Sequence, residues 1–159
     1  MKKLLRFGFG LALALLLSSG PAWAQNNVIK LPQPDLSQGK NVMQAIQDRK
    51  SERVFSPKEL SNQQLADIIW AAAGINRRTG EGKVGRTAPS SHNDQAVDAY
   101  AFIRTGVYKY DPVRHELNLI LEGDHRNKAG VQSYVATAPL NILLVADMSK
   151  ISGDTERDK

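Results

Sequence analysis

Two periodicities of hydrophobic residues divide the chain into predicted helices and predicted strands. Between residues 65 and 72, Leu, Ile, Ile and Ala recur at the i, i+3, i+4 and i+7 positions of an amphipathic helix. Ser61 and Gln64 form a capping box in front of this helix, and Gly74 stands where a C-terminal cap is expected. The helical spacing of Val, Met and Ile predicts a second, shorter helix over residues 41–50.

Four apolar runs predict strands, and the last of them has the continuous apolar character of a buried strand. The runs cover residues 99–104, 106–110, 116–121 and 141–147. The turn-forming pair Asp111-Pro112 separates the second run from the third. The residues around Val135 are expected to end a further helix ahead of Pro139.

Two segments lack this patterning. Residues 25–40, which include Pro32 and Pro34, are predicted to form an extended arm. Residues 75–98 hold three glycines and are predicted to form a long polar loop, which in a small domain is usually functional or disordered. The order helix, helix, loop, strands, helix, strand indicates an α+β fold, in which helices flank an antiparallel sheet.

The first 24 residues are predicted to be a secretory signal peptide. A basic start is followed by the apolar run 11–17, and Ala22-Trp23-Ala24 provides the small residues that signal peptidase recognises. The alternative, an uncleaved anchor, is disfavoured because the apolar run is short for a membrane span. We therefore expect an exported protein, periplasmic or secreted, without a stable membrane anchor.

Removal of the signal peptide changes the charge balance. The chain has 21 basic and 16 acidic residues, and three of the basic ones precede residue 24, which leaves a net charge of +2. The sequence therefore does not predict a nucleic-acid partner. The absence of cysteine excludes disulfides and thiol chemistry. His92, His115 and His125 share no metal-ligand spacing, so no metal site is predicted.

The remaining 135 residues, from Gln25 to Lys159, are enough for one domain with a core. After the strand predicted at 141–147 the chain ends on the polar residues 152–159, where a further loop or helix is expected to begin. We interpret residues 41–159 as the N-terminal part of a domain that is incomplete in this chain.

A basic cluster, Arg49-Lys50-Ser51-Glu52-Arg53, follows the shorter predicted helix. Three cations and a hydroxyl within five residues suit a phosphate, which accepts several donors from different directions. An equally good explanation is that the basic side chains only complement the helix C-terminus and its macrodipole. The cluster by itself leaves both interpretations open.

A second run of polar residues, Pro89-Ser90-Ser91-His92-Asn93-Asp94-Gln95, lies in the predicted loop. Its short side chains donate and accept hydrogen bonds and could bind the polar edge of a planar heterocycle. The same residue types are favoured in ordinary turns, and for the run alone that explanation is the better one.

Together, in this order and spacing, these segments resemble the nitroreductase family of flavin enzymes. Residues 49–53 match the family's basic-x-Ser-x-basic motif, and Phe55 follows as it often does in the family. Residues 65–72 and 89–95 match its Leu-x-x-(Ile/Leu)-(Leu/Ile)-x-x-Ala and Pro-Ser-x-x-Asn-x-Gln motifs. The stretches 86–90 and 106–117 are most similar to the branch that includes azoline-oxidising dehydrogenases. The resemblance covers about residues 41–147.

The resemblance implies FMN as the cofactor. In the family the first motif holds the FMN phosphate and reaches the pyrimidine part of the ring, and here that role falls to Arg49, Lys50, Ser51 and Arg53. The second motif lies beside the flavin, typically across the subunit interface. The residues that match it are Pro89, Ser90, Ser91, Asn93 and Gln95.

The resemblance also implies an oxidoreductase that transfers hydride between a donor such as NAD(P)H and a small nitroaromatic, quinone or heterocyclic acceptor. Family members are usually homodimers and continue past the last strand predicted here. The cofactor supplies the chemistry, so no general acid or base is assigned. The alternatives are a flavin- or ligand-binding protein of the same fold without turnover, and a structural or interaction module.

Overall fold

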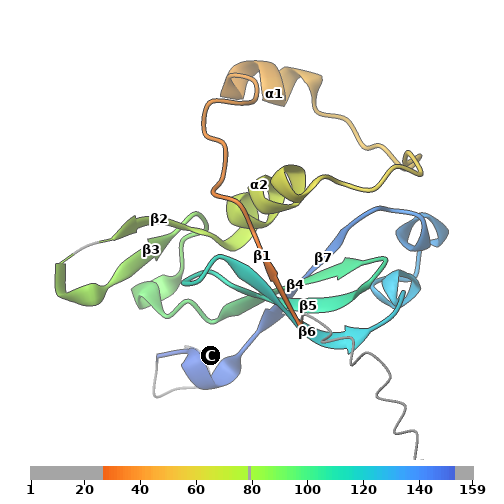
Figure 1. Ribbon diagram of the computed structural model, residues 1–159. Coiled ribbons are helices and arrows are strands. Elements are labelled where there is room, and N and C mark those ends of the chain that lie inside the picture. The colour runs from red at the N-terminus through yellow and green to blue at the C-terminus, as the bar shows by residue number, and fades with distance from the viewer. Residues whose placement is uncertain (1–26, 79, 153–159) are drawn as a thin grey trace, which may run out of the picture.

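The main sheet has five antiparallel strands in the order β1-β6-β5-β4-β7 (Figure 1). The computed structural model describes residues 27–78 and 80–152, so the predicted signal peptide and the last seven residues lie outside the described residues. The strands are β1 (Val28–Lys30), β4 (Val97–Ile103), β5 (Gly106–Asp111), β6 (Glu116–Glu122) and β7 (Asn141–Ala146). The four predicted strands are confirmed, with ends shifted by one or two residues.

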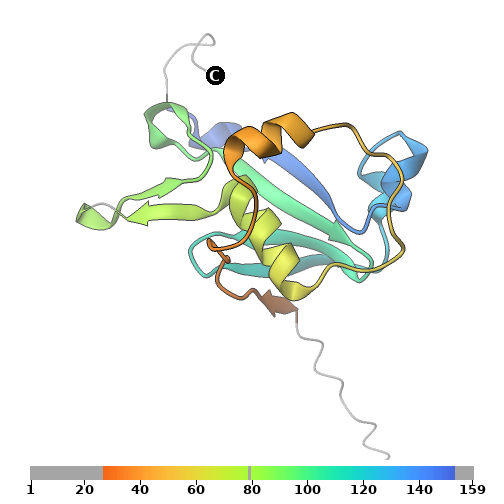
Figure 2. The ribbon, with the colours of Figure 1, turned by 90° about the horizontal axis from the view of Figure 1, so that it is seen from above.

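Helix α2 (Asn62–Ala73) lies across one face of this sheet and forms the core with it (Figures 1 and 2). Ile69 from the helix and Leu117 from β6 are fully buried. Burying a side chain of this size stabilises a fold by about 1.5–3 kcal/mol. Ser61 and Gln64 form the predicted capping box, and Gly74 caps the other end. The sheet with its helices confirms the predicted α+β fold.

Helix α1 (Val42–Asp48) begins at an Asn41 cap and lies on the outer side of α2 (Figure 1). The shorter predicted helix is therefore confirmed. Its apolar side chains are not packed: Val42, Met43 and Ile46 are 69%, 70% and 62% exposed. The amphipathic pattern of this helix thus has no buried counterpart within the described chain.

The prediction of a polar loop over residues 75–98 was wrong for its first half. Strands β2 (Ile75–Arg78) and β3 (Val84–Arg86) form an antiparallel hairpin there, closed by a 3₁₀ turn at Gly80–Gly82. The hairpin projects away from the main sheet in both ribbon views (Figures 1 and 2). Because three of the four residues of β2 are exposed and β3 is only three residues long, the hairpin lacks the apolar alternation by which strands are recognised.

The prediction of a buried strand at residues 141–147 was also wrong in its burial. Strand β7 pairs with β4 at one edge of the sheet, and Ile142 is its residue that packs against the core. Leu143, Leu144 and Val145 are exposed. The helix expected before Pro139 is a short 3₁₀ segment, Ser133–Ala136.

The segment predicted as an extended arm contributes strand β1, which pairs with β6. A buried polar chain holds the residues that follow it. His115 Nε2 donates to the Pro32 carbonyl (2.7 Å), and its Nδ1 therefore accepts from the Tyr110 hydroxyl (2.8 Å). Burial raises the pKa of Tyr110 to about 12, so its hydroxyl keeps the proton that it donates.

Candidate functional site

The basic cluster at residues 49–53 lies in extended chain beyond the end of α1. Arg49 is the C-terminal cap, and its backbone N–H donates to the Ile46 carbonyl (3.3 Å). Helix α1, which is fully described, has no basic residue in its last turn. Arg49, Lys50, Ser51 and Arg53 are all exposed. An interaction with the C-terminus of α1 can therefore explain Arg49 alone. The side chains of Lys50, Ser51 and Arg53 remain available to a ligand.

Arg53 connects the cluster to the rest of the fold through Tyr134. The Arg53 guanidinium carbon lies 5.9 Å from the centroid of the Tyr134 ring, within the range of a cation–π contact. Phe55 stacks obliquely on the same ring, with a centroid distance of 6.4 Å. Tyr134 was missed by the sequence analysis because no local pattern links it to a segment so distant along the chain.

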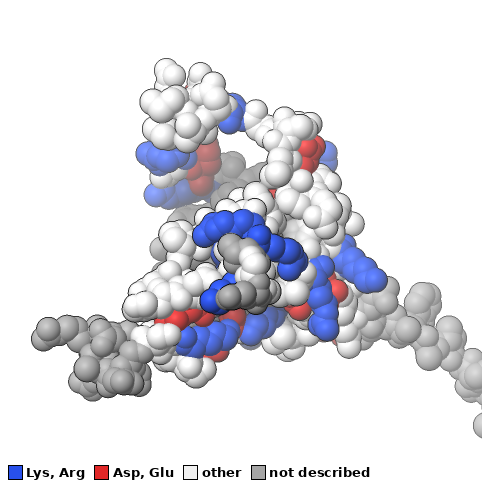
Figure 3. All heavy atoms as spheres, turned by 90° about the vertical axis from the view of Figure 1, so that its left-hand side faces the viewer, with Lys and Arg blue, Asp and Glu red and all other residues white. Residues whose placement is uncertain are grey.

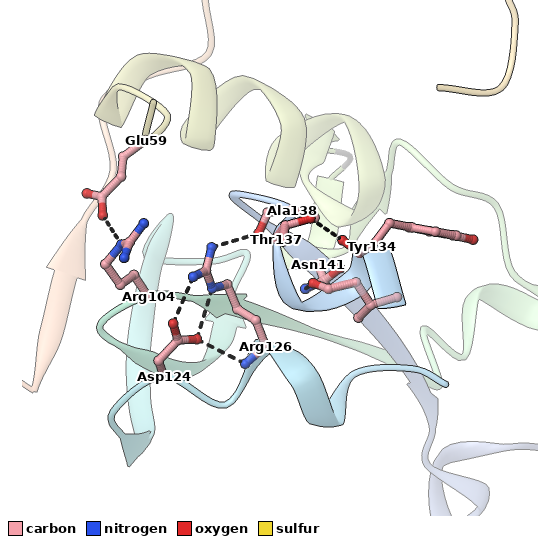
Figure 4. Close-up of polar contacts among 9 residues, drawn as sticks. Glu59, Arg104, Asp124, Arg126, Tyr134, Thr137, Ala138 and Asn141 are labelled. Atoms are coloured by element: carbon pink, nitrogen blue, oxygen red, sulfur yellow. Dashed lines mark hydrogen bonds and ion pairs between the residues drawn. The ribbon is translucent and has the colours of Figure 1, made fainter. Parts of the chain in front are cut away.

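The position of Tyr134 depends on Arg126, which is 7% exposed (Figure 4). The Arg126 guanidinium donates to the Ala138 carbonyl (2.9 Å) and forms a two-point pair with Asp124, with N···O distances of 2.9 and 2.7 Å. Nearby, Asn141 Nδ2 donates to the Val135 carbonyl (3.0 Å). The bonds to Val135 and Ala138 hold the C-terminal side of the 3₁₀ segment that carries Tyr134.

The Asp124–Arg126 pair predicts a specific acid sensitivity. Hydrogen bonds from Arg126 lower the pKa of Asp124 from 3.8 to about 2, so the charged carboxylate favours the folded state. Its stabilisation is complete above about pH 4 and is lost as the pH falls through about 2. Asp124→Asn should therefore be less stable than the parent at pH 7, and this difference should shrink between pH 4 and pH 2 in urea denaturation. A difference independent of pH would contradict the assignment.

The second run, at residues 89–95, folds into a tight turn that is tied to β3. The amide groups of Asn93 and Gln95 both donate to the Val84 carbonyl, at 3.0 and 2.8 Å. The Ser90 hydroxyl accepts from the Gln95 backbone N–H (3.0 Å). In the described chain these polar groups position the turn, while the Ser91 side chain is exposed and contacts only its neighbour His92 (3.2 Å).

The backbone of this turn is strained at three positions. His92, Asn93 and Gln95 have φ values of 49°, 60° and 52°, in the left-handed region that side chains disfavour by roughly 1–2 kcal/mol each. Such strain persists only where surrounding bonds enforce it, and it concentrates at ligand-binding segments. The bonds to Val84 and Ser90 provide that enforcement, so the turn has one defined shape.

Arg86 was not identified as a site residue from the sequence, yet it braces the turn. Its Nε donates to Gln95 Oε1 (3.0 Å) and its Nη1 to the Val97 carbonyl (2.9 Å). Next to it lies a hollow of about 150 Å³ with mainly apolar walls. Its lining includes Ala72, Ala73, Ala88, Pro89, Val97 and Leu144. The only signal in the sequence was a basic residue three positions before Pro89.

The two segments of the predicted site lie at opposite ends of the molecule. Both ribbon views place the extended chain after α1 beside the blue 3₁₀ segments (Arg126–Lys128 and Ser133–Ala136) and the 89–95 turn beside the β2–β3 hairpin (Figures 1 and 2). The fold thus does not bring the predicted residues together within one chain.

No group of three or more His, Asp or Glu side chains in the described residues is arranged to hold a metal ion. No helix in the described ranges is both long enough and apolar enough to cross a membrane.

Comparison with known proteins gives a consistent family assignment. A crystal structure from Ralstonia eutropha, provisionally named a nitroreductase, is 42% identical with a TM-score of 0.70, covering 79% of this chain and 58% of that one. A curated Methanocaldococcus jannaschii protein, also provisionally named a nitroreductase, is 25% identical over 134 residues, covering 78% of this chain and 65% of the relative. The chain therefore spans less than two thirds of the length of either relative.

A further crystal structure, from Anabaena variabilis, has a TM-score of 0.50 at 20% identity and covers 57% of this chain and 21% of that one, which is a likeness of fold alone. The model of the nitroreductase family matches residues 46–159, well over half of the sequence. This match includes the 49–53 cluster, α2, the β2–β3 hairpin and the 89–95 turn. The chain belongs to the nitroreductase family.

Proposed function

We propose that this chain belongs to an exported, FMN-dependent oxidoreductase. The enzyme transfers hydride between a donor such as NAD(P)H and a small organic acceptor of the nitroaromatic, quinone or heterocycle class. The observation that carries the proposal is the exposed set of donors at residues 49–53, in a chain of the nitroreductase family. Flavin binding in this family supports FMN as the cofactor.

The donors at residues 49–53 fit the phosphate of FMN. Arg49 and Arg53 supply planar guanidinium groups, and Ser51 supplies a small hydroxyl. Lys50 pairs with Glu52 at 2.7 Å, but both side chains are exposed, and such a pair contributes little. A phosphate dianion can therefore displace Glu52 and recruit Lys50 at small cost.

FMN, when bound, supplies the hydride chemistry. The residues of this chain bind and orient it. The cations of the 49–53 cluster hold the phosphate, and one of them placed near the pyrimidine part of the ring favours negative charge there. Tyr134 and Phe55 limit where Arg53 can reach, because both rings pack at that point of the chain.

The second wall of the site comes from another copy of the chain in this proposal. The 89–95 turn lies at the far end of the molecule from residues 49–53, so a site that uses both segments needs two subunits (Figures 1 and 2). The exposed apolar residues of α1 and β7 offer surface for such a homodimer. The proposed site would therefore be composite, with two equivalent copies per dimer.

A subunit-mixing experiment tests the composite site. Arg49→Ala/Arg53→Ala damages one wall, and Ser91→Asp places a negative charge on the other. Each variant alone is expected to lose FMN binding, whereas co-expression restores roughly one quarter of the sites, because half of the dimers are mixed and carry one intact site. FMN bound per protein is the measurement. No restoration would mean that each site lies within a single subunit.

The activity itself is tested on the purified exported form. We expect a yellow protein whose flavin absorbance is bleached by a reduced nicotinamide under anaerobic conditions and recovers on adding a nitroaromatic or a quinone. Yellow protein without bleaching by any donor would identify a flavin-binding protein without turnover. Colourless protein that ignores added FMN would refute both functions.

A further inference from the structure

A hollow of about 320 Å³ lies between the β2–β3 hairpin and the turn that joins β5 to β6. Four parts of the chain surround it: β2, the turn at residues 112–115, Trp70 of α2, and Gln33 ahead of the helices. It shares no lining residue with the segments at 49–53 and 89–95. Its volume is at the lower end of the range for small-molecule sites, roughly 300–1,000 Å³.

The charge of this hollow is strongly positive. Arg77, Arg78 and Arg114 line it, and none of its lining residues is Asp or Glu. Basic side chains gather over the same hairpin in the space-filling view (Figure 3). Like charges around a concave surface add their potentials and concentrate anions there.

The three arginines are not neutralised within the described chain. No described carboxylate forms an ion pair with Arg77 or Arg78. Arg114 lies 3.6 Å from Asp111 and 4.0 Å from Glu116, and its side chain is 72% exposed, so these pairs are weak. All three guanidinium groups can therefore turn their donors toward an anion.

The backbone of β3 gives Arg77 room to lie along the hairpin. A Cβ atom built on Gly85 would approach the Arg77 guanidinium carbon to 2.4 Å. The absence of a side chain at residue 85 thus lets this guanidinium rest across the neighbouring strand. Arg77 Nη1 also donates to Asn76 Oδ1 (3.0 Å), which limits its orientation.

The remaining walls are rigid and include an aromatic surface. The Trp70 indole N–H donates to the Ile75 carbonyl (3.1 Å), so the ring is fixed at the base of the hairpin. His115 uses both ring nitrogens, toward Tyr110 and Pro32, and its ring is therefore held in place. A ligand here meets three arginines and the Trp70 side chain.

We propose that this hollow binds a small organic oxyanion, a phosphate or a carboxylate carried on a compact planar group. The arginines bind the oxyanion through charge-assisted hydrogen bonds, and Trp70 packs against the planar group. None of the residues that line this hollow is among those assigned to the flavin.

Trp70 makes the proposal directly testable. The chain has two tryptophans, Trp23 and Trp70, so an exported form that begins at Gln25 keeps Trp70 alone as a fluorescent reporter. Phenyl phosphate or benzoate is expected to change this fluorescence saturably, and the tighter of the two identifies the oxyanion. Neutral benzyl alcohol is the matched control and should give no saturable change. Higher salt should weaken the binding.

Variants distinguish the hollow from general surface charge. Arg77→Gln/Arg78→Gln, and separately Arg114→Gln, should raise the dissociation constant at least tenfold, since about 1.4 kcal/mol is a factor of ten. The exposed Lys58→Gln is the control and should leave it unchanged. The affinity for phenyl phosphate, measured by calorimetry, should be the same with and without FMN, because the hollow shares no lining residue with the segments assigned to the flavin.

Several outcomes overturn the proposal. The proposal is wrong if neither anion changes the fluorescence, if benzyl alcohol changes it equally, or if both arginine variants keep the parent affinity. It is also wrong if the polyanion heparin binds but the small anions do not, or if FMN competes with them. Thermal melts of each variant identify loss of folding. Since both arginine variants change exposed side chains, at least one folded variant remains to decide the question.

Discussion

Replacing Arg49 and Arg53 together with Ala is expected to reduce the affinity for FMN by a factor of about 100 or more. A hydrogen bond to a charged group contributes about 1.5–3 kcal/mol, so losing two guanidinium groups removes at least about 3 kcal/mol. Each 1.4 kcal/mol corresponds to a factor of about ten in the dissociation constant. Quenching of flavin fluorescence during titration measures this change directly.

The stability of the double variant should be unaffected, because both side chains are exposed and the contact of the Arg53 side chain within the described residues is a cation–π contact. Lys58→Ala is a matched control, since it removes an exposed cation from the next part of the same segment. As the salt concentration rises, the FMN affinity of the parent should fall more steeply than that of the double variant. Unchanged FMN affinity in a folded double variant would show that the cluster does not hold the phosphate.

Replacing Arg126 with Met is expected to lower the free energy of unfolding by about 2–3 kcal/mol. The change leaves the Ala138 carbonyl without its donor and Asp124 without its two-point partner (Figure 4). Methionine keeps much of the apolar stem of Arg126, so the loss in unfolding free energy comes mainly from the missing hydrogen bonds of the guanidinium. Because the half-exposed Asp124 can be rehydrated, the effect falls below that of breaking a fully buried pair. Urea denaturation measures it.

The same variant should also weaken FMN binding, although Arg126 lies outside the proposed clamp. Loosening of the segment at Ser133–Ala136 would release Tyr134, against which Arg53 and Phe55 pack. Arg114→Met is the control for stability, since its exposed side chain forms only long ion pairs. A variant that loses stability but keeps full FMN affinity would separate Tyr134 from the clamp.

Local patterns in the sequence predicted those elements whose local and tertiary requirements agree. Helix α2 combines an apolar stripe with a capping box, and its Leu65 and Ile69 are buried against the sheet, although Ile68 of the predicted stripe is 41% exposed. The β5–β6 hairpin was equally clear, since Asp111-Pro112 marks its turn. For these elements local signals, the cap and the turn, coincide with the ends that the tertiary structure requires.

Prediction failed where burial depends on neighbours rather than on the pattern itself. The residues of β7 are as apolar as those of a central strand, yet β7 lies at an edge, and Leu144 is 57% exposed. The β2–β3 hairpin has the opposite character: backbone pairing forms it, while Arg77 and Arg78 of β2 are exposed. The apolar composition of β7 therefore predicted more burial than it has, and the polar composition of the hairpin gave no indication of its strands.

The sequence by itself determined the family motifs, the α+β class and the chemistry of the donors at residues 49–53, because these depend on residue types and short spacings. Only the tertiary structure decided how distant segments meet. It packs Tyr134 against Arg53, ties the 89–95 turn to β3, and separates that turn from the 49–53 cluster. Such contacts follow from the pairing and packing of whole elements, which no local run of residues encodes.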